Sequence, residues 1–208
     1  MIRRQSRYFF ERMSILADSF RRAVALVAIL NLAYFGVEFA VALSIESVSL
    51  FADSIDFLED TAVNFLIFAA LGWSAYARSI VGMLLAALLL APGIATLWMA
   101  WQKFGAPIPP DPVSLSVTGV GALVVNAACA LILARYRKQS SSLTRAAYLS
   151  ARNDAFANVA IIAAGIGTAA TDSAWPDLVV GLGIFAINLD AAREVFTTAR
   201  AEHSEAQG

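Results

Sequence analysis

Long apolar runs alternate with short polar breaks along this chain of 208 residues. Most of the runs reach the ~20 residues that a helix needs to cross a ~30 Å hydrocarbon core. The last run is shorter and reaches that length only if its helix continues to Val195. The pattern predicts six membrane-spanning helices, over Ala23–Leu43, Leu50–Trp73, Ile80–Trp101, Val113–Leu133, Ala146–Ala170 and Trp175–Leu189.

The runs are apolar on every side, which favours helices over the ~10-residue alternating strands of a membrane β-barrel. Composition agrees, because 59% of the residues are hydrophobic, 15% are charged and the mean hydropathy is +0.68. We therefore expect an all-α integral membrane protein in a lipid bilayer. Its expected parts are an amphipathic N-terminal segment at 1–22, a six-helix transmembrane domain at 23–195 and a short polar cytoplasmic tail at 196–208.

The N-terminal segment combines several Phe and Arg residues. This combination suits a helix that lies on the inner membrane surface, and it equally suits a solvated helix that merely precedes the first span. The segment has no continuous apolar core with a small-residue cleavage site, so we do not expect it to be a signal peptide.

Basic residues indicate the orientation of the spans. Thirteen of the fifteen lie in the N-terminal segment, the second loop, the fourth loop and the tail. The other loops, around Glu46, Lys103 and Asp172, hold one basic residue between them. By the positive-inside rule both termini are cytoplasmic. Since topology accounts for the basic residues, no nucleic-acid partner is indicated. The brevity of the chain and the absence of a targeting signal suggest a bacterial cytoplasmic membrane.

Composition also excludes several kinds of site. Cys129 is the only cysteine and His203 is the only histidine, so neither a disulfide framework nor a His/Cys zinc knuckle can form. No Ser–His pairing, phosphate loop or nucleophile elbow occurs, so we do not expect an enzyme.

A row of acids interrupts the second expected span, in the stretch "SVSLFADSIDFLEDTAVN". Asp53, Asp56 and Asp60 are spaced i, i+3 and i+7, which places them on one face of a helix. Insertion scales assign each charged residue at the bilayer centre a cost of ~2.5–3.5 kcal/mol. Protons or a divalent cation would neutralise the row. A purely structural alternative is pairing with Arg152, the one basic residue inside an expected span.

A second polar row lies in the fifth expected span, in "YLSARNDAFANVAII". Ser150, Asp154 and Asn158 are spaced i, i+4 and i+8, and Asn153 is adjacent to that face. The second and fifth spans are expected to be antiparallel, with the two rows at similar depth. Together they offer the oxygen ligands of a cation site. Arg152 lies on another side of the helix and is expected to reach the membrane surface, or to pair with Glu59 or a lipid phosphate.

Polar residues in other spans give a weak sign of an inverted repeat. Asn31 and Glu38 precede the first acid row much as Asn126 precedes the second, with three spans in each half. We expect Asn31 and Asn126 to form interhelical hydrogen bonds rather than to act as ligands.

The two motifs, inside six spans with cytoplasmic ends, resemble the cation diffusion facilitator family over nearly the whole chain. The resemblance implies homodimers with a bundle of six transmembrane helices that exchange zinc or another transition metal for protons. It also implies a four-ligand metal site to which the second and fifth helices contribute. By position, its ligands are Asp56, Asp60 and Asp154, and Asn158 matches a frequent Asn. The stretch "WPDLVVGLGIFAI" resembles the start of the sixth helix of the family, with Asp177 in place.

The chain departs from the family pattern at Ser150, where many zinc-moving members carry His. The fourth ligand could be Ser150, Asp53, Asn153 or a water. Family frequency favours Zn²⁺ as the transported ion, whereas an all-oxygen site also suits Mn²⁺. Co²⁺, Fe²⁺ and Cd²⁺ stay open, and no permanently bound cofactor is expected.

The second departure is the tail, which is shorter than the cytoplasmic domain that typical members carry. We expect a short form without that domain, in which the membrane helices make the dimer interface. The expected function is metal efflux by proton antiport with alternating access. The alternatives are a membrane sensor or buffer that binds metal without transport, and a helix-packing scaffold.

Overall fold

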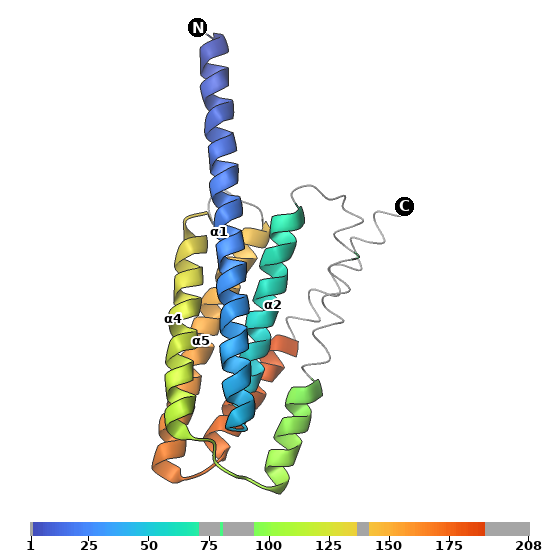
Figure 1. The fold of residues 1–208 in the computed structure, drawn as a ribbon, viewed down its shortest axis with the longest axis vertical. Coiled ribbons are helices and arrows are strands. Elements are labelled where there is room, and N and C mark those ends of the chain that lie inside the picture. Colours follow the sequence, from blue (N-terminus) through green and yellow to red (C-terminus); the bar gives the residue numbers. More distant parts are fainter. Residues whose placement is uncertain (1, 71–79, 81–93, 137–141, 190–208) are drawn as a thin grey trace.

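The computed structural model describes residues 2–70, 80, 94–136 and 142–189, and outside short turns these residues are helical (Figure 1). Shorter helices cover 94–105 and Trp175–Leu189. No strand occurs among the described residues, so the expected all-helical class is confirmed for that part of the chain. The labelled helices are α1 (Ile2–Ser44), α2 (Val48–Ala70), α4 (Pro112–Ala134) and α5 (Ser142–Thr171).

Three of the described helical stretches are long and apolar enough to cross a membrane: Asp18–Ser44 of α1, α4, and Ala147–Thr171 of α5. Helix α2 has 23 residues, as many as α4, but its row of acids lowers its hydropathy. Most of the expected third span, and the continuation of the sixth beyond Leu189, lie outside the described residues. The count of six spans therefore stays a prediction.

Helix α1 runs without a break from Ile2 to Ser44, so the N-terminal segment and the first expected span form one helix. Figure 1 shows that the first part of this helix extends beyond the other helices.

Four helices form a closed ring in which α1 packs on α2, α2 on α5, α5 on α4, and α4 on α1. Helices α1 and α5 lie on opposite sides of this ring and do not touch, and α2 and α4 touch only slightly across it. Figure 1 shows α1 and α5 running in one direction and α2 and α4 in the other, so the expected antiparallel relation of α2 and α5 is confirmed. The polar faces of α2 and α5 can therefore meet at the same depth.

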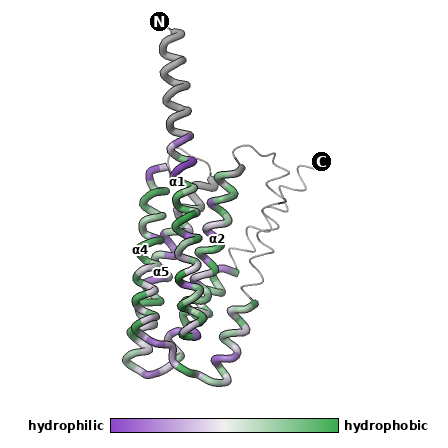
Figure 2. Tube along the Cα trace, viewed as in Figure 1, coloured by the Kyte–Doolittle hydropathy of each residue, from purple (hydrophilic) through white to green (hydrophobic). Residues whose placement is uncertain are grey.

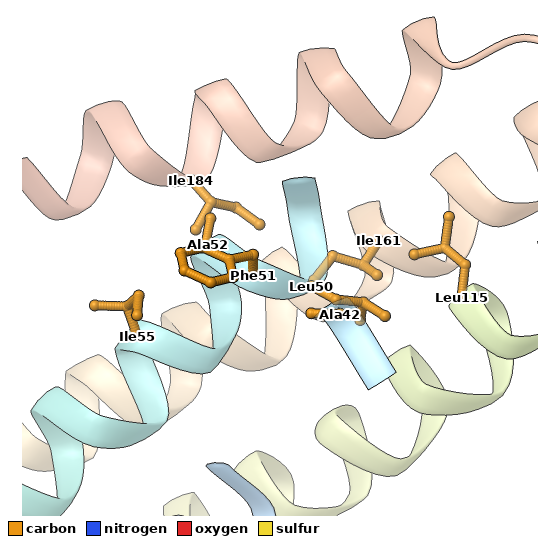
Figure 3. Close-up of a cluster of buried hydrophobic side chains, with 8 residues drawn as sticks. All are labelled: Ala42, Leu50, Phe51, Ala52, Ile55, Leu115, Ile161 and Ile184. Atoms are coloured by element: carbon orange, nitrogen blue, oxygen red, sulfur yellow. The ribbon is translucent and has the colours of Figure 1, made fainter. Parts of the chain in front are cut away.

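The interior of the bundle is layered. The first apolar cluster lies toward the end that holds the α1–α2 turn, which we call the turn end (Figure 3). The second apolar cluster lies toward the opposite end, where α5 begins and α4 ends. Polar side chains occupy the layer between them. The first apolar cluster is Ala42, Leu50, Phe51, Ala52, Ile55, Leu115, Ile161 and Ile184. The second is Val24, Val27, Cys129, Leu133, Ala147 and Ala151.

Polarity is inverted relative to a water-soluble bundle. Large apolar side chains such as Ile29, Leu131 and Phe156 are exposed on the outer surface, whereas Asn31 and Glu38 are fully buried. Figure 2 shows hydrophobic positions along the bundle helices and hydrophilic positions gathered at the turns. An outer surface of this kind suits contact with lipid tails, and it agrees with the expectation of a membrane protein.

The start of α2 is capped by a residue from another helix. Asp177, on the helix Trp175–Leu189, is fully buried and accepts hydrogen bonds from the backbone N–H of Val48 at 2.9 Å and of Ser49 at 3.1 Å. The hydroxyls of Ser47 and Ser49 donate to the same carboxylate at 2.7 and 2.6 Å. The first N–H groups of a helix have no partner within it, and a negative charge is stabilising there. Asp177 therefore fixes where α2 begins.

Lys103 corrects one expectation. The sequence placed it in a loop, but the helix over 94–105 extends past Trp101, and the Lys103 side chain is only 5% exposed. The ammonium lies 3.4 Å from Asp177 Oδ2 and donates to the backbone carbonyl of Glu46. The carboxylate and the carbonyl replace the water that the ammonium loses, which explains how a lysine can be buried at this end of the bundle.

A substitution at Gly181 tests how closely the helix Trp175–Leu189 packs against α2. A Cβ at Gly181 would lie 2.7 Å from the backbone N of Ser49 and from the carbonyl carbon of Val48, and backbone cannot move aside easily. We expect Gly181→Ala to lower the free energy of unfolding by about 1–3 kcal/mol, the usual cost of overpacking. Thermal unfolding of the purified protein in detergent measures this. Gly183→Ala is the control, since a Cβ there meets nothing within 4 Å.

The ion pair of Lys103 and Asp177 gives a second prediction. Asp177→Asn removes the charge and leaves the buried ammonium unpaired, which should cost about 3–5 kcal/mol of stability. The double variant Lys103→Met with Asp177→Asn should recover part of this loss, because no buried charge is then left alone. Unfolding of both variants and of Lys103→Met completes a double-mutant cycle. Strictly additive effects would show that the two side chains do not stabilise each other.

Candidate metal site

The polar rows of α2 and α5 meet at Ser150. Its hydroxyl lies 3.0 Å from Asp60 Oδ1 on α2 and 3.4 Å from Asp154 Oδ2 on its own helix. Asp60 is 4% exposed, and Asp154 and Ser150 are half-buried. One hydroxyl thus links acids from two antiparallel helices. Three residues that the sequence assigned to a cation site are therefore neighbours in the structure.

Asp56 lies on the same face of α2 and is 8% exposed. Its Oδ1 accepts a hydrogen bond from the side-chain amide of Asn188, on the helix Trp175–Leu189. The sequence pattern alone did not single out Asn188. The available signal was an amide inside the apolar run "GLGIFAINL", in the stretch that also contains Asp177.

Asp53 continues the row toward the turn end and is fully buried. The amide of Asn158 on α5 donates to its Oδ2 at 2.6 Å, and the oxygen of Asn158 accepts from Asn126 on α4 at 3.2 Å. On α1, the amide of Asn31 lies 3.4 Å from Asp60 Oδ2. Asn31 and Asn126 therefore form the interhelical hydrogen bonds that the sequence predicted for them.

The structure does not bring Asn153 into this group. Its side chain is exposed and accepts a hydrogen bond of 3.3 Å from Arg152, which is also exposed. Asn153 immediately precedes Asp154 in the helix and so lies about 100° around it, away from the face that meets α2. The Arg152 side chain lies beside Asn153, and in the described part of the chain its guanidinium forms no ion pair with Glu59 or with the acid rows.

The acids are thus held by neutral donors. Amides of Asn31, Asn158 and Asn188 and the hydroxyl of Ser150 contact the carboxylates. Within the described ranges, the ion pair with a basic side chain is the one between Lys103 and Asp177. Several buried carboxylates close to one another without a basic partner attract a cation strongly.

The carboxylates are not gathered into a finished ligand cage. Among the residues described, no three His, Cys, Asp or Glu side chains are close enough together to hold a metal ion as they stand. Ser150 and Asn188 instead occupy carboxylate oxygens that a metal would need. Rotation of these two side chains would free those oxygens and would allow their own oxygens to act as ligands. Oxygen donors of this kind suit divalent cations.

Comparison with known families agrees with the polar rows. The cation efflux transmembrane domain matches this chain over residues 24–202. The match begins within α1 and includes all of α2, α4 and α5. A search of curated proteins finds no match.

A substitution of Arg152 distinguishes a cation-binding role of the acid rows from a purely structural one. Because Arg152 is exposed and contacts Asn153 rather than an acid, Arg152→Gln should change the free energy of unfolding by no more than about 0.5 kcal/mol. Thermal unfolding in detergent provides the measurement, with Arg135→Gln, another exposed arginine, as the matched control. A large loss of stability in Arg152→Gln alone would mean that this guanidinium neutralises the acid rows.

Proposed function

The chain belongs to the cation efflux family, whose transmembrane domain covers residues 24–202, and we propose that it exports a divalent transition-metal cation in exchange for protons. Members of this family transport metal cations and are not enzymes. The proposed binding site consists of Asp56 and Asp60 on α2 and Asp154 on α5. Ser150 supplies the fourth ligand, with Asp53 and Asn158 as its neighbours toward the turn end.

The observation that carries this proposal is the position of Ser150 between Asp60 and Asp154, at 3.0 and 3.4 Å. A hydroxyl oxygen this close to two carboxylates from different helices marks a point where one cation can contact both helices at once. Binding there would draw α2 and α5 together, and release would let them separate. The state of the site is thereby linked to the packing of the bundle.

The layered interior supports alternating access. The first and second apolar clusters lie on opposite sides of the polar layer and separate it from the two ends of the bundle. An exporter would open the second cluster to admit a metal ion from the cytoplasm and then the first cluster to release it outside. Packed clusters switch between discrete arrangements rather than deforming continuously, which suits such a two-state cycle.

Protons are the proposed counter-ions. A metal binds the ionised carboxylate, so binding from the cytoplasm releases protons and external protons displace the metal. Since the one histidine is His203, outside the described residues, the carboxylates of the two rows have to carry these protons. Neutral donors such as Asn31 and Asn188 are compatible with both the protonated and the ionised forms.

Zinc is the proposed cargo ahead of Mn²⁺, Co²⁺, Fe²⁺ and Cd²⁺. Zn²⁺ accepts Asp oxygens at ~2.0–2.2 Å, and a tetrahedral site needs four ligands, which three aspartates and one serine supply. An all-oxygen site also suits Mn²⁺, so the choice between these ions is open to direct measurement. We further propose that the protein acts as a homodimer through its membrane helices, in a bacterial cytoplasmic membrane.

Transport into inside-out vesicles tests the proposal. With an acidic interior, the wild type should accumulate Zn²⁺, and Asp154→Asn should lower the initial rate more than about tenfold, equivalent to ~1.4 kcal/mol. Asp172→Asn is the matched control, because Asp172 is exposed just after α5 and its positive φ of 47° is one that Asn tolerates.

The same vesicles, loaded in turn with each candidate metal, identify the cargo. Accumulation that disappears when the pH gradient is collapsed supports antiport. Binding without accumulation would favour a sensor or buffer. Equal rates for Asp154→Asn and the wild type would reject the site between α2 and α5.

A further inference from the structure

A second pair of acids lies beside the proposed site. Glu38, near the end of α1, is fully buried, and it is close enough to the buried carboxyl of Asp53 on α2 for the two acids to interact electrostatically. Neither oxygen of Glu38 has a hydrogen-bond partner among the described residues, and neither does Oδ1 of Asp53. Three carboxylate oxygens on two neighbouring helices are therefore buried without a donor among the described residues.

The nearest donors are already engaged elsewhere. Tyr34, one turn before Glu38 on α1, donates its hydroxyl to the backbone carbonyl of Thr118 at 2.6 Å. The amide of Asn158 donates to Asp53 Oδ2 at 2.6 Å and so satisfies the fourth oxygen of the pair. Packing has thus fixed the two carboxylates in position without supplying a group that neutralises them.

Such an arrangement calls for a positive occupant. Two buried acids that interact electrostatically repel each other when both are ionised, and burying an isolated carboxylate costs several kcal/mol even after the protein relaxes. Most buried polar atoms have partners, so three unpartnered oxygens at one point require a specific explanation. A helix-packing role would be served better by an amide pair, which supplies its own donors.

The position of the pair along α2 indicates its use. Asp53 lies about 4.5 Å before Asp56 and about 10 Å before Asp60 along the helix axis, in the direction of the turn end. Residues of the first apolar cluster, such as Leu50 and Ile55, flank Asp53 on the same helix. The pair therefore lies between the proposed metal site and the turn end of the bundle.

We propose that Glu38 and Asp53 form a second position for the divalent cation, which it occupies on its way between the Asp56, Asp60 and Asp154 site and the turn end. This inference rests on the proposed function for the identity of the cargo, but the binding position itself does not depend on transport. Carboxylate oxygens are its protein ligands, with water completing the shell, so it takes hard or borderline cations such as Mn²⁺ and Zn²⁺.

A second position would help a cation to move. Release from a tight site is faster when a neighbouring site can accept the ion, as in channels that bind ions at several adjacent positions. Asn158 belongs to the polar row of α5 and donates a hydrogen bond to Asp53, so it connects the second position to the proposed metal site. A cation at the pair would also repel a second cation at Asp56, which favours stepwise passage over simultaneous tight binding.

Metal stoichiometry tests the inference without a transport assay. The full chain is purified in detergent and equilibrated with Mn²⁺ alone, and bound metal is counted per chain by elemental analysis. We expect two equivalents for the wild type, one for Glu38→Gln and one for Asp154→Asn. Mn²⁺ ions this close broaden each other's electron paramagnetic resonance signal, so the spectrum should sharpen in Glu38→Gln. Zn²⁺ is measured in the same way.

Glu46→Gln is the matched control, because Glu46 is an exposed glutamate on the adjacent turn and should leave both equivalents bound. Asp53→Asn provides a second variant that should lose the same equivalent as Glu38→Gln, should the latter fail to fold. Two equivalents in both variants would overturn the inference and would mean that the pair shares a proton instead. One equivalent in the wild type would also overturn it.

The two proposals fail separately. Loss of one equivalent in Glu38→Gln, in a protein that moves no metal into vesicles, would uphold the second position and reject transport. If the wild type binds one equivalent of metal and still accumulates metal under a pH gradient, transport is upheld and the second position is rejected.

Discussion

Buried carboxylates on α2 have to be satisfied from the neighbouring helices, and this requirement organises the interior of the bundle. Hydrocarbon offers no water to solvate an acid, so each carboxylate needs a partner within the protein. Helix α1 supplies Asn31, α5 supplies Ser150 and Asn158, and the helix Trp175–Leu189 supplies Asn188. Three of the described helices that pack against α2 therefore each contribute at least one donor to its acids. The hydrogen bonds of this polar layer hold the helices together, in addition to the packing of the two apolar clusters.

Asp177 shows how the same side chain behaves when its role is structural. It receives backbone and hydroxyl hydrogen bonds at the start of α2, and Lys103 provides a full positive charge at 3.4 Å. Asp56 and Asp60 are buried to a similar degree, but their hydrogen-bond partners are amides and a hydroxyl. The protein thus pairs an acid with a cation of its own where the contact is permanent. The contrast supports the proposal that the acids of the polar layer wait for a cation from outside.

Much of this architecture was predictable from the sequence. Periodicity placed the fourth span within one residue of α4 at each end, and the spacing of the acids predicted the shared face that α2 presents to α5. Periodicity defines a face but not which neighbour it meets, and so Asn188 was missed although its amide contacts Asp56. Lys103 was misplaced for a related reason. A lone lysine beyond an apolar run usually marks a loop, and only the tertiary position of Asp177 makes its burial possible.

The neutral donors around the acids also bear on how a cation could leave the proposed site. A transporter needs binding that is strong enough to capture the ion and weak enough to release it. Each amide or hydroxyl that contacts a carboxylate competes with the metal for the same oxygen, and it takes that oxygen back when the metal departs. Ser150 and Asn188 therefore lower the net gain from binding and reduce the cost of the empty state. Replacing Ser150 with an imidazole would add a stronger metal ligand and would therefore slow release of the ion, which gives a physical reason for a hydroxyl at this position in a reversible site.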